Sequence, residues 1–183
     1  MAVSENVSAK LALEVDRLDQ YHRRPNLMIR NVKLSAQETQ QQVEAKVVKI
    51  IASDLKLAEA SKDIDKLHQV GKVKTNGDGR TQDIIVRFKS HEMRYKVFDE
   101  RKKAKNNVKI APNLTQRRGK LLYDASVFVN DIGGVNFVYA NSHGDLNIRL
   151  NDDKTYGGKH VFKFSTPDDL KKTLNDMGLL VET

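Results

Sequence analysis

The sequence predicts an α+β protein made of a short N-terminal helix and two small domains. Helical and strand-like spacings of apolar residues alternate along its 183 residues. Pro25 and the Gly133-Gly134 pair interrupt these patterns. Positive charge is concentrated: 13 basic and 4 acidic residues stand between Arg80 and Lys120, a net charge of +9 against +8 for the whole chain. The expected boundaries are residues 1–22 for the helix, 23–113 for the first domain and 114–183 for the second.

The composition is that of a soluble globular protein, with 39% hydrophobic and 31% charged residues. A net charge of +8 favours polyanionic partners such as nucleic acid. The chain has no cysteine, which excludes disulfides, thiolate zinc sites and cysteine nucleophiles. No apolar run approaches the roughly 18 residues of a membrane span, and no secretory signal is recognisable. We therefore expect no membrane partner and a cytoplasmic location, with the nucleus as a second one.

The N-terminal segment up to about Tyr21 is expected to be a helix. Its residues Leu11, Val15 and Leu18 follow a four–three spacing between charged side chains. Two interpretations stay open: the stripe packs against the helix's own domain, or it is the end of a coiled coil that joins several chains. Pro25 ends the helix because a proline disfavours helical backbone at the preceding residue.

The first domain is expected to contain a four-stranded antiparallel sheet. Its patterns run strand, helix, strand, strand, helix, strand, the split βαβ order that places two helices on one face of a sheet. An Asn-Gly-Asp-Gly turn joins the second and third strands, and Ser35 with Glu38 has capping-box spacing before the first helix. The expected elements are the strand Asn26–Val32, the helix Thr39–Leu55, the strands Ile64–Val73 and Asp83–Lys89, the helix from Glu92 to about Lys105 and the strand Val108–Ala111.

This order invites comparison with the RNA-recognition fold, whose first and third strands usually carry stacking aromatic residues. Met28 stands where the first aromatic residue is expected, and the alternate apolar residues from Ile84 to Phe88 should point inward. Strand alternation leaves Arg30 and Arg87 on the open face. Because the aromatic platform is missing, we expect phosphate contacts rather than base stacking to dominate binding.

The second domain is expected to begin and end with a helix around a small sheet. Leu121, Leu122, Ala125 and Phe128 form the apolar side of its first helix. After residue 120 the chain has six basic and nine acidic residues, a net charge of −3. The expected elements are the helix Leu114–Val129, the strands Val135–Ala140, Leu146–Leu150 and Val161–Phe164, and a last helix capped by Ser165 or Thr166 and closed by Gly178.

Clustered cations mark the end of the first domain and the start of the second. Phosphate contacts carry little sequence information, and the affinity they supply falls steeply with salt. The plainer interpretation is that these side chains solvate a helix face. The positive charge is uncompensated and continues across three elements, which favours a polyanion. The candidate residues are Arg101, Lys102, Lys103, Lys105, Arg117 and Arg118.

Several segments resemble one known family. The stretch DIIVRFKSHEMRYKVFDERKKAK is similar to the core signature of the first open-reading-frame protein of LINE-type non-LTR retrotransposons. HRRPNLMIRNV, NLTQRRGKLL, NFVYANSHGDLNIRL and FSTPDDLKKTL resemble further parts of that family in the same order, so that the resemblance covers roughly residues 17 to 178.

This resemblance implies a coiled-coil homotrimer that binds single-stranded RNA in a basic cleft between its two domains. It also implies nucleic-acid chaperone activity within a ribonucleoprotein that serves retrotransposition. By position, Arg101 matches the basic residue that closes the second helix, and Arg117 with Arg118 matches the paired arginines that open the C-terminal domain. Tyr139 matches the aromatic residue of that domain's first strand.

The residues do not favour an enzyme. The five histidines are scattered without metal-ligand spacing, and no nucleophile elbow or phosphate-binding loop appears. We therefore expect no catalytic residue, no metal and no cofactor. Single-stranded DNA stays an alternative ligand. The alternative function is a non-catalytic interaction or structural protein, derived from such an element, that has lost RNA binding.

Overall fold

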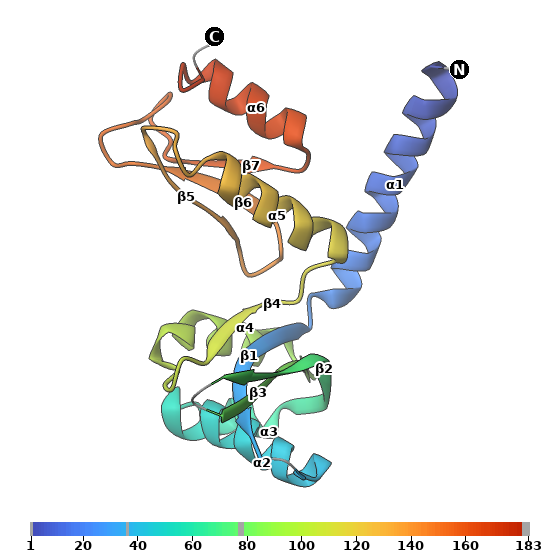
Figure 1. Ribbon diagram of the computed structural model, residues 1–183, viewed down its shortest axis with the longest axis vertical. Coiled ribbons are helices and arrows are strands. Elements are labelled where there is room, and N and C mark those ends of the chain that lie inside the picture. The colour runs from blue at the N-terminus through green and yellow to red at the C-terminus, as the bar shows by residue number, and fades with distance from the viewer. Residues whose placement is uncertain (1, 36, 77–78, 181–183) are drawn as a thin grey trace. The chain divides into compact units, whose positions relative to one another are not determined.

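The computed structural model describes residues 2–35, 37–76 and 79–180, and it confirms the α+β class. Helices accompany two antiparallel sheets, and the chain forms two compact units (Figure 1). The central unit spans His22–Asn113. The terminal unit combines the N-terminal segment up to Tyr21 with the chain from Leu114 onward. The N-terminal helix therefore belongs with the C-terminal part of the chain, which the sequence did not predict.

The central unit contains a four-stranded antiparallel sheet with the order β2-β3-β1-β4. Its first strand is longer than expected because a bulge between Ile29 and Val32 lets pairing continue. β2 and β3 pair out to Asn76 and Gly79, and the expected turn at 77–78 lies outside the described residues. The strands are β1 (Asn26–Leu34), β2 (Ile64–Asn76), β3 (Gly79–Phe88) and β4 (Lys109–Pro112).

The first helix of the central unit is α2 (Gln40–Lys49), which continues as a π-helical turn over Ile50–Asp54. Thr39 caps it, since the Thr39 side chain accepts from the backbone N–H of Gln42 and the Gln42 side chain accepts from that of Thr39. The expected capping box at Ser35 is therefore wrong by one turn. The backbone of Ser35 still donates to the Glu38 carboxylate.

Two further helical segments flank the β2–β3 hairpin in the sequence. The short helix α3 (Ala58–Lys62), which the sequence pattern did not indicate, precedes β2. α4 (His91–Asp99) is capped by Ser90 and tightens into a 3₁₀ turn over Glu100–Lys103. This turn holds three of the basic residues singled out above.

Alternate strand residues and the apolar sides of the helices form the core of the central unit. Leu27 and Ile29 of β1 and Ile84 and Val86 of β3 are fully buried, as strand alternation predicted. Helix residues pack against them and close one face of the sheet. They include Val43, Val47, Ile51, Leu55, Val97 and Phe98.

Arg94 of α4 lies in this core rather than on the basic surface, with an exposed fraction of only 1%. Its Nη2 donates to the backbone oxygen of Asn26 at 3.5 Å, and its guanidinium carbon lies 5.3 Å from the centre of the Tyr95 ring and 5.5 Å from that of Phe98. Its Nε and Nη1 have no hydrogen-bond partner among the described residues. Burial lowers the pKa of Arg94 to about 10 despite the opposing charges of Tyr95 and Asp99.

We expect Arg94→Met to leave the free energy of unfolding unchanged or to raise it by up to about 2 kcal/mol, because an apolar side chain of similar length removes a buried charge. The lowered pKa means that the cost of this charge is present in full below pH about 10 and is relieved only as pH rises beyond it. Urea unfolding followed by circular dichroism measures the change. Arg94→Lys keeps the charge and should not gain stability, and a loss in Arg94→Met alone would contradict the argument.

The terminal unit contains a three-stranded antiparallel sheet with the order β5-β6-β7. The bounds of all three strands are those that the sequence predicted. α5 begins two residues later than expected, because Thr115 is its cap and accepts from the backbone N–H of Arg118. The elements are α5 (Gln116–Phe128), β5 (Val135–Ala140), β6 (Leu146–Leu150), β7 (Val161–Phe164) and α6 (Pro167–Asp176).

The core of the terminal unit forms between its sheet and the helices α5 and α6. Leu121 and Ala125 of α5 are buried as predicted and Leu122 is half-buried, whereas Phe128 is exposed. The assignment of Phe128 to the apolar side of the helix is therefore wrong, because α5 ends at this residue and the core continues through Val129. Both ends of α6 are as expected: Thr166 caps its N-terminus, and Gly178, which follows its C-terminus, has a φ of 65°.

The first helix, α1 (Ala2–Arg23), packs on the terminal unit through polar side chains. Gln20 is buried, and its Oε1 accepts from the backbone N–H of Thr115 at 3.0 Å. The Thr115 hydroxyl donates to Asp16 at 2.5 Å. Gly144 has a φ of 81°, and a Cβ there would lie 2.4 Å from the Gln20 amide nitrogen, so another residue would strain the backbone and displace the Gln20 side chain. No helix within the described ranges has the length and apolar character needed to cross a membrane.

Candidate nucleic-acid interface

The central sheet presents an open face opposite its core. Register aligns Met28 of β1 with Ile85 of β3 and Ala111 of β4, and Ile85 with His68 of β2. Met28, Ile85 and Ala111 are half-buried and His68 is exposed. The strand residues described on this face include no Phe or Tyr, as the sequence predicted. The middle of the face is therefore mildly apolar without a stacking surface.

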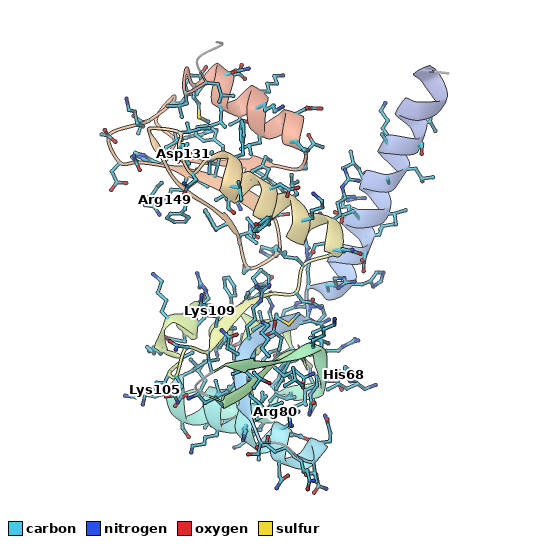
Figure 2. All side chains as sticks on the ribbon, in the orientation of Figure 1. His68, Arg80, Lys105, Lys109, Asp131 and Arg149 are labelled. Atoms are coloured by element: carbon cyan, nitrogen blue, oxygen red, sulfur yellow. The ribbon has the colours of Figure 1, made fainter. Side chains whose placement is uncertain are left out.

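Basic side chains lie on both sides of this row. Arg30, two residues after Met28, is opposite Lys109, and Arg87 is opposite Lys66. All four of these side chains are exposed. Arg87 Nε is 3.4 Å from a carboxylate oxygen of Asp65, whereas the other three form no ion pair with another described residue. The face thus carries cations on both sides of its apolar row. Figure 2 labels Lys109 and His68.

A second group of cations lies at the end of α4. The guanidinium carbon of Arg101 stands 4.0 Å from the centre of the Phe98 ring, and its Nη1 donates to the Phe98 backbone oxygen at 2.7 Å. These contacts hold the half-buried Arg101 in one orientation. Lys103 pairs with Glu100 at 2.5 Å. Lys102 and Lys105 are exposed and have no ion pair within the described ranges.

The two arginines that open α5 have different environments. Arg117 is exposed, and its side chain makes no hydrogen bond to another described residue. The side chain of Arg118 is only 17% exposed; its Nε lies 2.8 Å from Asp16, and its Nη1 donates to the backbone oxygen of Gly144 at 2.9 Å. Arg118 therefore joins α1 to the β5–β6 turn, and a phosphate would reach it only in competition with these partners.

The turn beside Arg118 is held by Asp145. Burial raises the pKa of this carboxyl. Its contacts with Lys163 at 3.1 Å, with Asn141 and with Arg118 at 3.7 Å lower the pKa by more than burial raises it, so that the net shift is downward. A carboxyl with a lowered pKa stabilises the fold above its ordinary pKa and loses that contribution as pH falls. The contacts around Asp145 thus weaken only on acidification.

Tyr139 projects from β5 and is half-buried. Its ring centre is 5.4 Å from that of Phe137, two residues earlier on the same strand, with 59° between the ring planes. Phe137 was not among the candidates chosen from the sequence. Strand alternation was the available signal, because residues 137 and 139 lie on the same face of any strand that contains both.

The predicted oligomerisation residues form an exposed stripe on α1. Leu11, Val15 and Leu18 are between 55% and 64% exposed, and Val7 and Tyr21 extend the stripe with similar exposure. Helical geometry places the stripe opposite the polar contacts that α1 makes with the terminal unit. The stripe is therefore not used in packing within the terminal unit.

No protein-family model matches this chain, and a search of curated proteins finds no match. The described residues include no group of three or more side chains suited to hold a metal ion.

Proposed function

We propose that the protein binds single-stranded nucleic acid, above all RNA, and that contacts to phosphates supply most of the affinity. The observation that carries this proposal is the set of exposed cations without an internal partner in the central unit, which accompanies a net charge of +9 between Arg80 and Lys120. These cations include Arg30, Lys66, Lys102, Lys105 and Lys109. Arg87, Arg101 and Lys103 complete the proposed interface of the central unit. Arg117 and Tyr139 are the proposed contacts of the terminal unit.

We further propose that this protein is the RNA-binding protein of a LINE-type retrotransposon and acts as a nucleic-acid chaperone. The resemblance of its sequence segments supports this, and so does the order β2-β3-β1-β4 with helices on one face, which is the order expected of an RNA-recognition-motif-like domain. The exposed stripe on α1 supports self-association, with a homotrimer as the expected state.

Binding to single-stranded RNA should weaken as salt rises, with the logarithm of affinity falling by about 0.7 for each phosphate contact per logarithmic unit of salt. Removing Lys102 and Lys105 together, by substitution with Ala, should lower affinity and reduce this slope by about 1.4, since both side chains are exposed and unpaired within the described residues. Fluorescence anisotropy with a labelled oligonucleotide at several salt concentrations measures both quantities.

The matched control is Lys171→Ala with Lys172→Ala on α6. It removes the same charge from two adjacent exposed lysines in the acidic region after residue 120. Its affinity and salt slope should stay close to those of the unsubstituted protein. Equal losses in the two double variants would mean that only total charge matters, and binding that does not respond to salt would overturn the proposal.

A protein-interaction module without RNA binding is the second candidate. It is favoured by the exposed apolar side chains Tyr123, Val127 and Phe128 on α5, which do not pack on the core. This alternative predicts no binding of single-stranded RNA even at low salt, so the same titration separates the two functions.

A further inference from the structure

The sheet of the terminal unit has an open face of different chemistry from the central one. Register aligns Phe137 of β5 with Arg149 of β6 and Val161 of β7. The next row on this face contains Tyr139, Asn147 and Lys163. The alternate residues of the same strands point into the core. Two aromatic rings on an edge strand therefore lie beside a column of polar and basic residues.

The first row is accessible. Phe137 is 44% exposed, Val161 is 40% exposed and the side chain of Arg149 is 45% exposed. Figure 2 shows Arg149 on the sheet of this unit. Its partner among the described residues is Asp152, at 3.9 Å, a separation too long for a strong ion pair. Lys163, in contrast, is held by Asp145 at 3.1 Å. Arg149 is thus the cation of this face that is most available to a ligand.

Geometry favours unpaired bases as the ligand of this face. The ring centres of Phe137 and Tyr139 are 5.4 Å apart, which is more than the roughly 3.4 Å between successive stacked bases in a duplex. Phe137 and Tyr139 can each receive a base only if neighbouring bases have come apart, as they do in a flexible single strand. Aromatic side chains receive any base in this way, because every base has a π-face.

Charge also separates this face from the central one. The chain after residue 120 has a net charge of −3, so general attraction to phosphates is weak there. A nucleic-acid contact in this region must therefore depend on stacking, with a single cation to fix the strand. A protein ligand fits the face less well, since apart from Val161 the exposed side chains around the aromatic pair are polar or charged.

We propose that Phe137 and Tyr139 stack two consecutive unpaired bases of a single-stranded nucleic acid, with Arg149 contacting the intervening phosphate. This inference rests on the proposed function and adds base stacking to it in the terminal unit. Stacking on aromatic side chains contributes roughly a fivefold to hundredfold gain in affinity for each base. The protein then distinguishes strands with bases from strands without them, which phosphate contacts alone do not do.

The test compares a uridine oligonucleotide with an abasic oligonucleotide of the same length and charge. The unsubstituted protein should bind the uridine oligonucleotide at least tenfold more tightly. Phe137→Leu should lower affinity for the uridine oligonucleotide at least fivefold and leave affinity for the abasic one and the salt slope unchanged. Tyr123→Leu, at an exposed aromatic residue of α5, is the matched control and should change neither affinity.

A second variant keeps the test independent of small changes in stability. The chain has no tryptophan, so Phe137→Trp introduces a single reporter on this face. Its fluorescence should be quenched by the uridine oligonucleotide and not by the abasic one. Equal affinities for the two oligonucleotides, with normal salt dependence, would overturn the stacking inference and leave the proposed function standing. Failure to bind either oligonucleotide at low salt would contradict the proposed function itself.

Discussion

Arg118→Ala is expected to destabilise the terminal unit by about 3 kcal/mol, because removal of one member of a largely buried ion pair leaves the other without its charge partner. Asp16 is only 10% exposed in its side chain and pairs with Arg118 at 2.8 Å. The backbone oxygen of Gly144 loses its donor as well. α1 should then separate more readily from the rest of the unit.

Arg117→Ala is the matched control, since it removes the same side chain one residue earlier, where the arginine is exposed. It should keep the melting temperature within about 1 °C and lower affinity for single-stranded RNA, whereas Arg118→Ala should lower the melting temperature by more than about 10 °C. Differential scanning fluorimetry and anisotropy measure the two effects. An Arg117→Ala, Arg118→Ala double variant should lose as much stability as Arg118→Ala, because Arg118 makes the contacts to Asp16 and Gly144. A double variant that melts like the unsubstituted protein would contradict the structural role of Arg118 as the link between α1 and the β5–β6 turn.

Leu11→Ser with Val15→Ser is expected to convert a self-associated protein into a monomer. Both side chains lie on the exposed stripe of α1 and make no contribution to the core of the terminal unit. Burial of a leucine or valine between helices contributes about 1.5–3 kcal/mol for each chain, so loss of two per chain should move the dissociation constant by several orders of magnitude.

Light scattering after size-exclusion chromatography, over a range of protein concentrations, measures this change. Ala12→Ser is the control, because Ala12 is an exposed residue of the same helix outside the stripe. The melting temperature of the unsubstituted protein should rise with protein concentration and that of the double variant should not, which would show that the stripe acts between chains rather than within one. An unsubstituted protein that is already a monomer at high concentration would contradict the proposed self-association.

Strand and helix positions could be predicted well where local pattern and packing agree. β5, β6 and β7 have the predicted bounds because alternation and flanking glycine or polar turns define short strands clearly. The bulge at Asn31 could not be predicted, since it depends on a backbone N–H bond to Asp83 and a side-chain bond to Asn107, both distant in sequence. Asn31 adopts a φ of 61° there, a conformation that asparagine tolerates better than most residues.

The candidate site was harder to predict, because the sequence does not reveal which basic side chains are buried or paired within the fold. Arg94, Arg117 and Arg118 are the same residue type and contribute the same charge to the sequence. In the structure Arg94 is buried between two rings, Arg118 holds α1 and only Arg117 is exposed without a partner among the described residues. These differences come from tertiary contacts with residues up to 102 positions away. Sequence patterns carry no information at that range.

The pairing of β1 with β4 has a topological consequence. Leu27, at the start of the central unit, is opposite Pro112, at its end, so the chain enters and leaves that unit about 5 Å apart. α1 and α5, which flank it in the sequence, pack together in the terminal unit through Asp16 and Arg118. The central unit is therefore an insertion within the terminal unit rather than the first of two consecutive domains.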